Sequence, residues 1–342
     1  MPVIISAIIS IGILVFIHEG GHFLCAKAFG VRVTEFMLGL PGPNLSFKFK
    51  GTKFGVTCVP LGGYARVCGM TRSPLHPKLK DVLASVYSRG EVLIEQVALD
   101  AGIDVKEAEE CLDELVQWGC VSDPKTSDKF NVYRTYETQG KPISFSSADE
   151  LFESEYNRQY RSKKFWQKSF IVLAGIAVNL IFAMLAFVFV YSVIGVDVQG
   201  EDGQITHFTA DPLRSIQAGF TYIIMTIQAI LSLLNPMTTA ETVSQSTSIV
   251  GIAYLSSDYF SRGLSEALLF MGMISASLGL MNLIPIPPLD GGLFLIEVIK
   301  KITKREVPEK VTTAISALGV CLLLALFVVT LGQDVQRFIL GG

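Results

Sequence analysis

Five consecutive residues near the N-terminus have the types and the spacing of a catalytic zinc site. Residues 18–22 read His-Glu-Gly-Gly-His, which matches the pattern H-E-x-x-H. On a helix, positions i and i+4 share one face, so His18 and His22 can bind one Zn²⁺ ion while Glu19 takes a proton from the attacking water. From residue frequencies alone, a chance match in a chain of this length is roughly a one-in-a-hundred event.

The apolar stretch around this motif gives its polar residues a functional meaning. Residues 3–28 are apolar and, at about 1.5 Å per residue, long enough to cross a hydrocarbon core of about 30 Å. Ionisable groups inside such a segment are costly and usually serve function. A cluster of interhelical hydrogen bonds is the structural alternative, but a metal site accounts for all three of His18, Glu19 and His22.

A catalytic zinc site usually has three protein ligands, so one ligand has to come from elsewhere. His76 begins a hydrophilic segment, and His207 falls on the opposite side of the membrane from the motif. Asp290 is the acidic residue of the proline-rich stretch 282–292, whose prolines break a helix where freed backbone groups can line a cavity. Asp290 is therefore the candidate third ligand, the alternative being that it only caps the next helix.

The composition is that of a membrane protein. Half of the 342 residues are apolar, 17% are charged and the mean hydropathy is +0.47, while a formal net charge of −3 does not indicate nucleic acid as a partner. The six cysteines lack CxxC spacing, and we expect free thiols. A cleaved signal peptide is the alternative for the first apolar stretch, but the chain begins Met-Pro without a basic region. We expect an α-helical polytopic membrane protein with about four transmembrane helices, at residues 3–28, 169–193, 264–284 and 311–331.

The charged residues orient these helices. Lysine and arginine are dense in the connection between the first two spans, whereas the connection 192–212 carries acidic residues and neither lysine nor arginine. The positive-inside rule then places the N-terminus outside and the first connection in the cytoplasm. A second basic cluster at 300–310 puts the end of the third span inside as well. One crossing satisfies this order, so the ambiguous apolar stretch 215–234 should lie along the membrane or re-enter it. The zinc motif and Asp290 then both lie toward the cytoplasmic side of the inner (plasma) membrane.

Between the first two spans, the sequence changes character twice. Apolar and polar residues alternate through 44–57 around Lys50-Gly51, which predicts a β-hairpin. Farther on, helices are predicted at 77–88, 92–100 and 105–118, with β-prone segments at 120–121 and 129–134, an order that resembles a winged helix. The helix that would enter DNA is strongly acidic and would repel phosphates. This insert therefore indicates a protein partner and no nucleic acid.

Taken together, these motifs resemble those of the site-2 protease family, the membrane-embedded zinc metalloproteases, in a bacterial type that lacks a PDZ domain. His18-Glu19-Gly20-Gly21-His22 resembles the first metal motif of the family, and Leu289-Asp290-Gly291 resembles the second. The other matching residues are Asn282, Pro285 and Pro287 before the second motif, 42–43 and 60–64 in a membrane-associated β-hairpin, and 165–168 with 175–179 at the start of the second helix.

The resemblance implies proteolysis of membrane-anchored substrates within or near the bilayer, with Zn²⁺ as the cofactor and Glu19 as the general base. It implies Asp290 as the third ligand beside His18 and His22. The positions implied to bind substrate are Asn282, Pro285, Pro287, Gly62 and Gly63. Substrates of bacterial members include anti-sigma factors and signal-peptide remnants, and the hairpin would hold the substrate in extended form by strand addition.

Two features depart from many bacterial relatives. The external connection 192–211 is far too short for a PDZ domain, and the insert instead lies on the cytoplasmic side, where we expect it to gate access or contact a protein partner. The expected organisation is a first transmembrane helix with the zinc motif (1–30), a membrane-associated β-hairpin (31–70), a winged-helix-like cytoplasmic insert (71–145), a linker and second transmembrane helix (146–195), a short external loop with a peripheral or re-entrant segment (196–262), and the third and fourth transmembrane helices with the second metal motif (263–342).

Two other functions use similar features. A metal transporter would also place His and Asp in the membrane, but it needs a polar relay across the bilayer, and the outer halves of these helices carry little except Ser and Gly. A membrane receptor with the insert as its working part would not need Glu19. We therefore expect an intramembrane zinc metalloendopeptidase that acts on single-span membrane proteins in the lipid bilayer.

Overall fold

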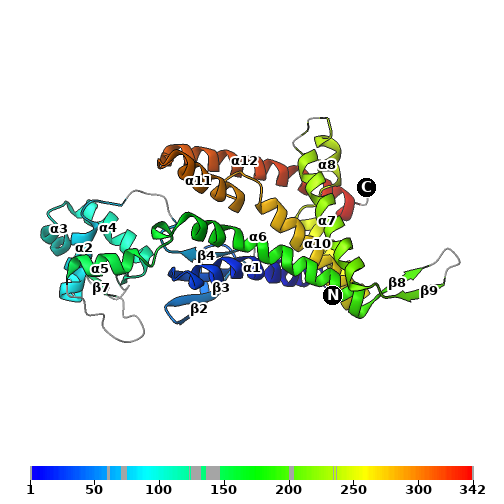
Figure 1. Ribbon diagram of the computed structural model, residues 1–342, viewed down its shortest axis with the longest axis horizontal. Coiled ribbons are helices and arrows are strands. Elements are labelled where there is room, and N and C mark those ends of the chain that lie inside the picture. The colour runs from blue at the N-terminus through cyan, green and yellow to red at the C-terminus, as the bar shows by residue number, and fades with distance from the viewer. Residues whose placement is uncertain are drawn as a thin grey trace. The chain divides into compact units, whose positions relative to one another are not determined.

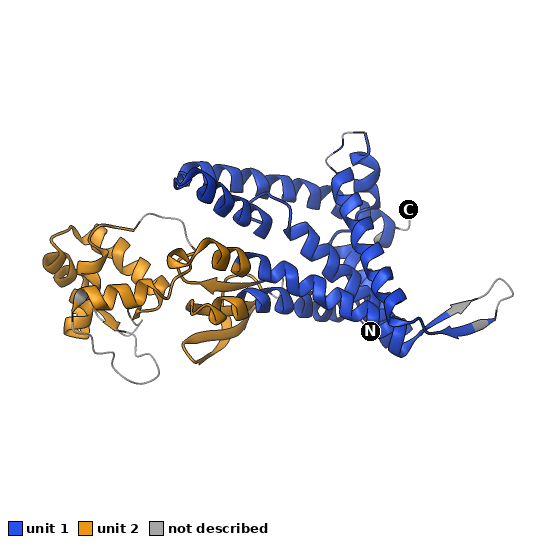
Figure 2. Ribbon diagram, in the orientation of Figure 1, with its two compact units in different colours: residues 1–22, 59–63, 172–342 blue, residues 23–58, 64–171 orange. Residues whose placement is uncertain are grey.

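The computed structural model describes residues 2–59, 62–70, 75–122, 124, 132–135, 147–199, 204–233, 235 and 237–340 (Figure 1). The chain forms two compact units (Figure 2). Unit 1 comprises residues 1–22, 59–63 and 172–342, and unit 2 comprises residues 23–58 and 64–171. Helices α1 (Val3–Ala28) and α6 (Phe165–Phe189) contribute residues to both units.

Unit 1 is built mainly from long apolar helices, and the chain is a multi-pass membrane protein. Five helical segments are long and apolar enough to cross a membrane: Val3–Ala28, Phe165–Ile194, Pro212–Ser232, Leu264–Asn282 and Lys310–Phe338. Four of these agree with the expected spans. The fifth is α7 (Pro212–Ser232), which covers most of the stretch 215–234 and which length and composition alone admit as a further crossing. The number of crossings expected from the sequence therefore stays a prediction.

The rest of unit 1 consists of shorter elements and the other helices. A hairpin of β8 (Val196–Gln199) and β9 (Ile205–Phe208) precedes α7. The elements that follow are α8 (Thr239–Gln245), α9 (Ile249–Arg262), α10 (Leu264–Asn282), α11 (Asp290–Thr303) and α12 (Glu309–Asp334). Neither α8 nor α9 is among the elements expected from the sequence. Both α6 and α12 end in a π-helical turn, at Val190–Ile194 and Val335–Ile339.

Helix α7 runs in a different direction from α1, α6 and α12 (Figure 1). It runs across α6 and α12 in Figure 1, whereas those two helices extend along the length of unit 1. Its start is fixed by Asp211, whose Oδ1 accepts a hydrogen bond from the Leu213 N–H at 3.0 Å. Gly219 of α7 packs against Met184 of α6, so that an added Cβ would lie 2.8 Å from the Met184 sulfur. The expectation that this segment does not fully cross the membrane stays a prediction.

Close packing between α6 and α10 sets the orientation of the helix next to the zinc motif. Gly272 and Gly279 of α10 face α6, where an added Cβ would lie 3.0 Å from the Ala186 Cβ and 3.2 Å from the Asn179 Cβ. The Ser275 hydroxyl donates a hydrogen bond to the Asn179 carbonyl at 2.9 Å. Small residues allow helices to approach closely in this way. The face of α6 that carries Asn179 is thereby fixed.

The first sheet of unit 2 confirms the predicted hairpin. Its strands are β1 (Val33–Leu38), β2 (Asn44–Phe49), β3 (Thr52–Thr57) and β4 (Gly63–Val67), in the order β2-β3-β1-β4. Strands β2 and β3 are antiparallel, and the turn residues Lys50 and Gly51 have φ of 46° and 80°, as a two-residue hairpin turn requires. All six residues of β2, at the edge of the sheet, are exposed.

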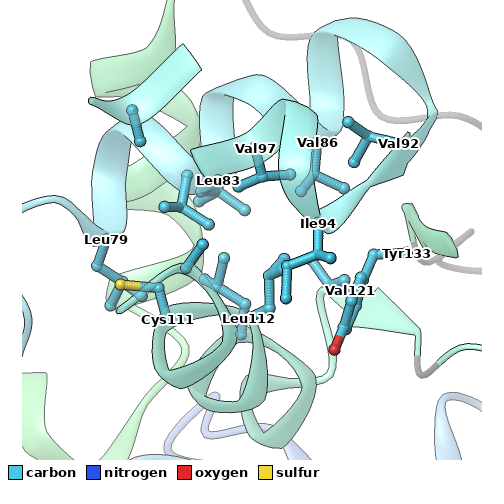
Figure 3. Close-up of a cluster of buried hydrophobic side chains, with 14 of the residues drawn as sticks. Leu79, Leu83, Val86, Val92, Ile94, Val97, Cys111, Leu112, Val121 and Tyr133 are labelled. Atoms are coloured by element: carbon cyan, nitrogen blue, oxygen red, sulfur yellow. The ribbon is translucent and has the colours of Figure 1, made fainter. Parts of the chain in front are cut away.

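The insert in unit 2 is a small helical domain with its own sheet. Its elements are α2 (Leu79–Arg89), β5 (Glu91–Leu93), α3 (Ile94–Ala101), α4 (Val105–Trp118), β6 (Val121–Ser122) and β7 (Val132–Thr135), followed by α5 (Ala148–Tyr156) and a 3₁₀ turn (Tyr160–Ser162). The three strands are antiparallel in the order β5-β7-β6. Figure 3 shows the buried side chains of these elements meeting in one core, which includes Leu83, Val97, Leu112 and Tyr133.

One predicted helix of the insert is confirmed, and another begins later than predicted. The helix predicted at 105–118 is confirmed as α4, with Asp104 and Glu107 forming a capping box. The helix predicted at 92–100 is wrong at its start, because Val92 lies in β5 opposite Tyr133 of β7 and the helix begins only at Ile94. Pairing with a distant strand has overridden the local preference. Residues 129–131 of the predicted β-prone tail lie outside the described residues.

Buried contacts join the insert to the first sheet. Arg32, just before β1, donates a hydrogen bond to the Trp118 carbonyl at 2.9 Å and forms an ion pair with the buried Glu155 at 2.6 Å. Cys68 lies beside the same carbonyl, and burial raises the pKa of its thiol to about 12. All six cysteines are free, as expected.

Candidate active site

Helices α1 and α11 bring three candidate ligands together within unit 1. The Asp290 Oδ2 atom lies 3.2 Å from both the His18 Nε2 and the His22 Nε2, and the two Nε2 atoms are 3.3 Å apart. Both histidines are buried, and their rings meet edge to face at a centroid distance of 4.9 Å. The ligand atoms predicted from two motifs at opposite ends of the chain therefore converge on one point.

The connection between α10 and α11 delivers Asp290 to this point. Prolines interrupt the chain after α10, and the connection folds back on the start of α11, where Gly291 and Gly292 leave room for it. A Cβ at Gly291 would overlap the Leu283 carbonyl, and one at Gly292 would overlap the backbone nitrogen of Pro287. The N-cap position of α11 is Leu289, which makes no side-chain capping bond. Asp290 is the first residue of α11, and its carboxylate faces the Nε2 atoms of both histidines.

Helix α6 contributes two residues to which the sequence analysis gave no role. A Cβ at Gly175 would overlap the His22 Nε2 and would lie 2.7 Å from the His18 Cε1, so glycine is what allows the imidazoles to lie against α6. Asn179, fully buried, places its Nδ2 atom 3.2 Å from the His18 Nδ1. The spacing 175–179 on one face of a helix was the available signal, because these positions match the second-helix segment of the family.

Most of the other predicted site residues lie on α1, at the end of α10 and in the α10–α11 connection. Asn282, the last residue of α10, places its Nδ2 3.4 Å from the His18 Nε2. Glu19 is partly buried on α1, next to His18. Pro285 and Pro287 lie in the α10–α11 connection, and a Cβ at Gly319 of α12 would overlap the Pro287 carbonyl.

Gly62 and Gly63 stand at the beginning of β4, where Gly62 has a positive φ of 78°. Gly63 is the first residue of this strand, which lies at the other edge of the sheet from β2. The role of these two glycines in binding substrate stays a prediction.

The donor set fits Zn²⁺. Two imidazole nitrogens and one carboxylate oxygen are ligands that zinc takes, and tetrahedral bonds of about 2.0–2.1 Å place the ligand atoms about 3.3 Å apart. The observed separations are 3.2, 3.2 and 3.3 Å. The Asp290 Oδ2 is buried without a hydrogen-bond partner, so it is an acceptor that a cation would satisfy. Three ligands leave a fourth position for water, as in catalytic zinc sites.

Comparison with known proteins identifies the family. Residues 6–326 match peptidase family M50. The chain belongs to this family. It is 24% identical to the regulator of sigma-W protease RasP of Bacillus subtilis, with 98% of this chain and 99% of the relative covered. It is also 24% identical to the zinc metalloprotease RasP of Geobacillus kaustophilus and 23% identical to that of Bacillus licheniformis, with at least 98% of every chain covered.

This M50 chain is accordingly a zinc metalloprotease of the site-2 protease family, with Zn²⁺ as its cofactor. An apolar cavity of about 570 Å³ borders its second motif. The cavity is lined by side chains of α7, α8, α10, α12 and the α10–α11 connection, including Met281 and Leu289. These two residues immediately precede Asn282 and Asp290.

Proposed function

We propose that this protease cleaves membrane-anchored substrates within or near the bilayer, with His18, His22 and Asp290 holding the zinc ion and Glu19 acting as the general base. One observation carries the proposal: three candidate ligand atoms, two from α1 and one from α11, lie 3.2–3.3 Å from one another. An apolar cavity lined by Leu289, the residue before Asp290, supports the proposal that substrates reach the site from the membrane. Anti-sigma factors and signal-peptide remnants are the substrates we expect.

The residues of the chain divide the work of peptide hydrolysis. A bound zinc ion lowers the pKa of water to about 7 and polarises a carbonyl group. Glu19 accepts the proton of the attacking water and passes it to the leaving amide nitrogen. Asn282 donates an amide hydrogen bond to the substrate, because its Nδ2 lies within 3.4 Å of the His18 Nε2 and so at the centre of the site. The apolar surroundings strengthen each of these interactions by excluding water.

Replacing Glu19 with glutamine tests this mechanism. Glutamine keeps the size of the side chain but cannot accept the proton, so we expect kcat to fall by about 10²–10⁴-fold while the bound zinc stays at the wild-type level. The measurement is cleavage of a tagged single-span substrate in proteoliposomes, together with the metal content of the same preparation. The matched control is Gly20→Ala on the same helix, where an added Cβ has no heavy atom within 4 Å.

Three outcomes would contradict the proposal. Continued cleavage by the Glu19→Gln variant would remove Glu19 as the base, and cleavage by the wild type that survives zinc chelation would remove the metal mechanism. Activity that is lost together with zinc in Glu19→Gln would make Glu19 a ligand instead of a base.

The proposed topology has the N-terminus outside and the site toward the cytoplasmic side of the plasma membrane, with α7 lying along the membrane. The acidic connection before α7, the basic cluster after α10 and the direction of α7 support it. A cysteine introduced at Thr206, in β9 of the hairpin before α7, should react with a membrane-impermeant maleimide in intact cells. Protection of this position until the membrane is opened would reverse the topology.

We also propose that β2 is the strand to which an extended substrate adds. It stands at the edge of its sheet with all six residues exposed, and Leu45, Phe47 and Phe49 give one of its faces an apolar character suited to the membrane. A substrate peptide with alternate N-methylated amides along its extended part should be cleaved more slowly, because it lacks the donors for the ladder. Equal cleavage rates would exclude strand addition.

The insert is proposed to be a winged-helix domain that contacts a protein partner. Its order of helices and strands and its sheet order β5-β7-β6 support this interpretation, as does the acidic surface of α4. Deleting residues 75–140 should change turnover or substrate selectivity in a reconstituted assay. Unchanged turnover and selectivity would contradict a role in gating.

A further inference from the structure

The buried side chain of Asn179 has an amide oxygen without a partner beside one of the candidate ligands. Asn179 is 0% exposed, and its Nδ2 lies 3.2 Å from the His18 Nδ1. Its Oδ1 is buried with no hydrogen-bond partner. A buried amide that leaves its acceptor unpaired is costly, which calls for an explanation.

With its nitrogen toward His18, this amide conflicts with metal binding. An amide nitrogen donates, so the Nδ1 of His18 would have to accept, and the ring proton of the neutral imidazole would then sit on Nε2. That atom faces the Asp290 Oδ2 at 3.2 Å and the His22 Nε2 at 3.3 Å. A proton there would occupy the lone pair that binds zinc. Oxygen and nitrogen of an amide have nearly the same size, so half a turn about the terminal bond exchanges them without repacking.

After that half-turn, both difficulties disappear. The Asn179 Oδ1 accepts a hydrogen bond from the Nδ1–H of His18, and the Nε2 lone pair points at the common centre of the three ligand atoms. Ligating histidines usually donate their second ring N–H to an oxygen in this way, which fixes the tautomer and the direction of the ring. Helix α10 holds Asn179 in place through the Ser275 hydroxyl at 2.9 Å and the closely packed Gly279.

We propose that Asn179 is the positioning residue of the zinc centre: its side-chain oxygen accepts the Nδ1–H of His18 and so presents Nε2 to the metal. The inference rests on the proposed function, which assigns His18, His22 and Asp290 as ligands. It adds α6 to α1 and α11 as a helix on which the metal site depends.

The test compares two variants of the full-length protein in detergent micelles, with zinc affinity measured by competition with a chromogenic chelator. Asn179→Leu keeps a similar volume but has no acceptor, and we expect the affinity to fall by about 10–100-fold, the range for the loss of such an outer partner. Asn179→Asp keeps an acceptor, and we expect its affinity to stay within about threefold of the wild type. Thermal unfolding of the zinc-free proteins controls for a general loss of structure.

The outcomes separate this inference from the proposed function. Wild-type zinc affinity in Asn179→Leu, or an equal loss in Asn179→Leu and Asn179→Asp, would overturn the role of Asn179 and leave the ligand assignment standing. An Asp290→Ala variant that binds zinc as tightly as the wild type would instead overturn the ligand assignment itself.

A measurement on the unaltered protein keeps the inference testable if Asn179→Leu does not fold. Solid-state NMR of zinc-loaded protein, with ¹⁵N in histidine and ¹³C in the asparagine side chains, detects the histidine nitrogens that contact an asparagine Cγ, and His18 should show two: Nδ1 near Asn179 and Nε2 near Asn282. We expect the Nδ1 of His18 to carry a proton. An unprotonated Nδ1 in contact with the asparagine carbon would overturn the proposal.

Discussion

Two carboxylates in unit 1, Asp290 and Asp334, each have a buried oxygen atom, and their surroundings differ. The Oδ2 of Asp290 faces the Nε2 atoms of two histidines at 3.2 Å. The Oδ2 of Asp334, at the end of α12, instead accepts hydrogen bonds from the backbone N–H groups of Ser248 at 2.6 Å and Gly251 at 3.2 Å, at the start of α9. One carboxylate meets nitrogens that can bind a cation, and the other meets donors.

The difference shows how the same side chain is used for chemistry and for architecture. The N–H groups at the start of a helix have no partner within the helix, and a carboxylate there is favoured by the helix dipole as well. The Oδ2 of Asp334 is therefore satisfied by backbone donors, whereas its Oδ1 is buried without a hydrogen-bond partner. Asp290 begins α11 but does not cap it, and its Oδ2 is left for a cation. Removing each carboxylate should separate metal binding from stability.

The largest effect is expected from Asp290→Ala. Loss of one of three ligands should lower the zinc affinity by more than about a hundredfold, since loss of an outer hydrogen-bond partner alone costs about 10–100-fold. Cleavage should become undetectable. Metal content after gel filtration and cleavage of a single-span substrate measure the two effects, with Asp334→Ala as the matched carboxylate control. Full zinc occupancy in Asp290→Ala would exclude Asp290 as a ligand.

The proposed ligand set could be put together from the sequence because each part carries its own local signal. The spacing of His18 and His22 on a helix indicates a shared metal, and the charge distribution along the chain places Asp290 at a similar depth. The contacts of α6 with these residues were not predictable in the same way. Asn179 and His18 are 161 residues apart, and their contact depends on how α6 is rotated against α1. That rotation is set by Gly272 and Gly279 of α10, and the sequence does not show which helix these glycines face.

A smaller effect than that of Asp290→Ala is expected from Gly175→Ala on α6. The added methyl group would overlap the His22 Nε2 and approach the His18 Nε2 to 2.9 Å, so the imidazoles must move. Displacements of about 1 Å in an active site can cost about 10²-fold in rate. We therefore expect zinc affinity and kcat/KM to fall by about 10–100-fold.

Thermal unfolding distinguishes this local effect from misfolding. Alanine favours a helix over glycine by about 1 kcal/mol, which offsets part of the cost of moving the two imidazoles, so the zinc-free Gly175→Ala protein should stay within about 1–2 kcal/mol of the wild type. Gly20→Ala is the control, because it makes the same change where an added Cβ has no heavy atom within 4 Å. Equal zinc affinity in both variants would mean that α6 does not confine the histidines.

Most of the fold between the motifs could be predicted only in outline. The hairpin around Lys50 and the long helices follow from local periodicity, which the sequence displays directly. The start of β5 was missed because Val92 pairs with Tyr133, far along the chain. The start of α9 has a local cap in Ser248, whose hydroxyl accepts from the Val250 N–H, but its second cap, Asp334, lies 86 residues after Ser248. Signals of this kind have no local pattern.

The smallest effect on function is expected from Asp334→Ala. The substitution leaves the N–H groups of Ser248 and Gly251 without their acceptor in a buried place, which should cost about 1–3 kcal/mol of unfolding free energy. Zinc affinity should remain within about twofold of the wild type, because the hydrogen bonds of Asp334 go to the start of α9 and not to the proposed ligands. Denaturant unfolding in micelles and chelator competition measure the two quantities.

The Asp334→Asn variant sharpens this last comparison. Asparagine keeps an oxygen that can accept from the same two N–H groups but carries no charge for the helix dipole. It should therefore lose only the dipole contribution of about 0.3–1 kcal/mol relative to the wild type, which is less than alanine loses. The same substitution at Asp290 should still abolish tight zinc binding, because a neutral amide is a poor ligand for zinc. If Asp334→Asn released zinc as Asp290→Asn does, the division between a chemical and an architectural carboxylate would fail, and the start of α9 would have to be coupled to the metal site.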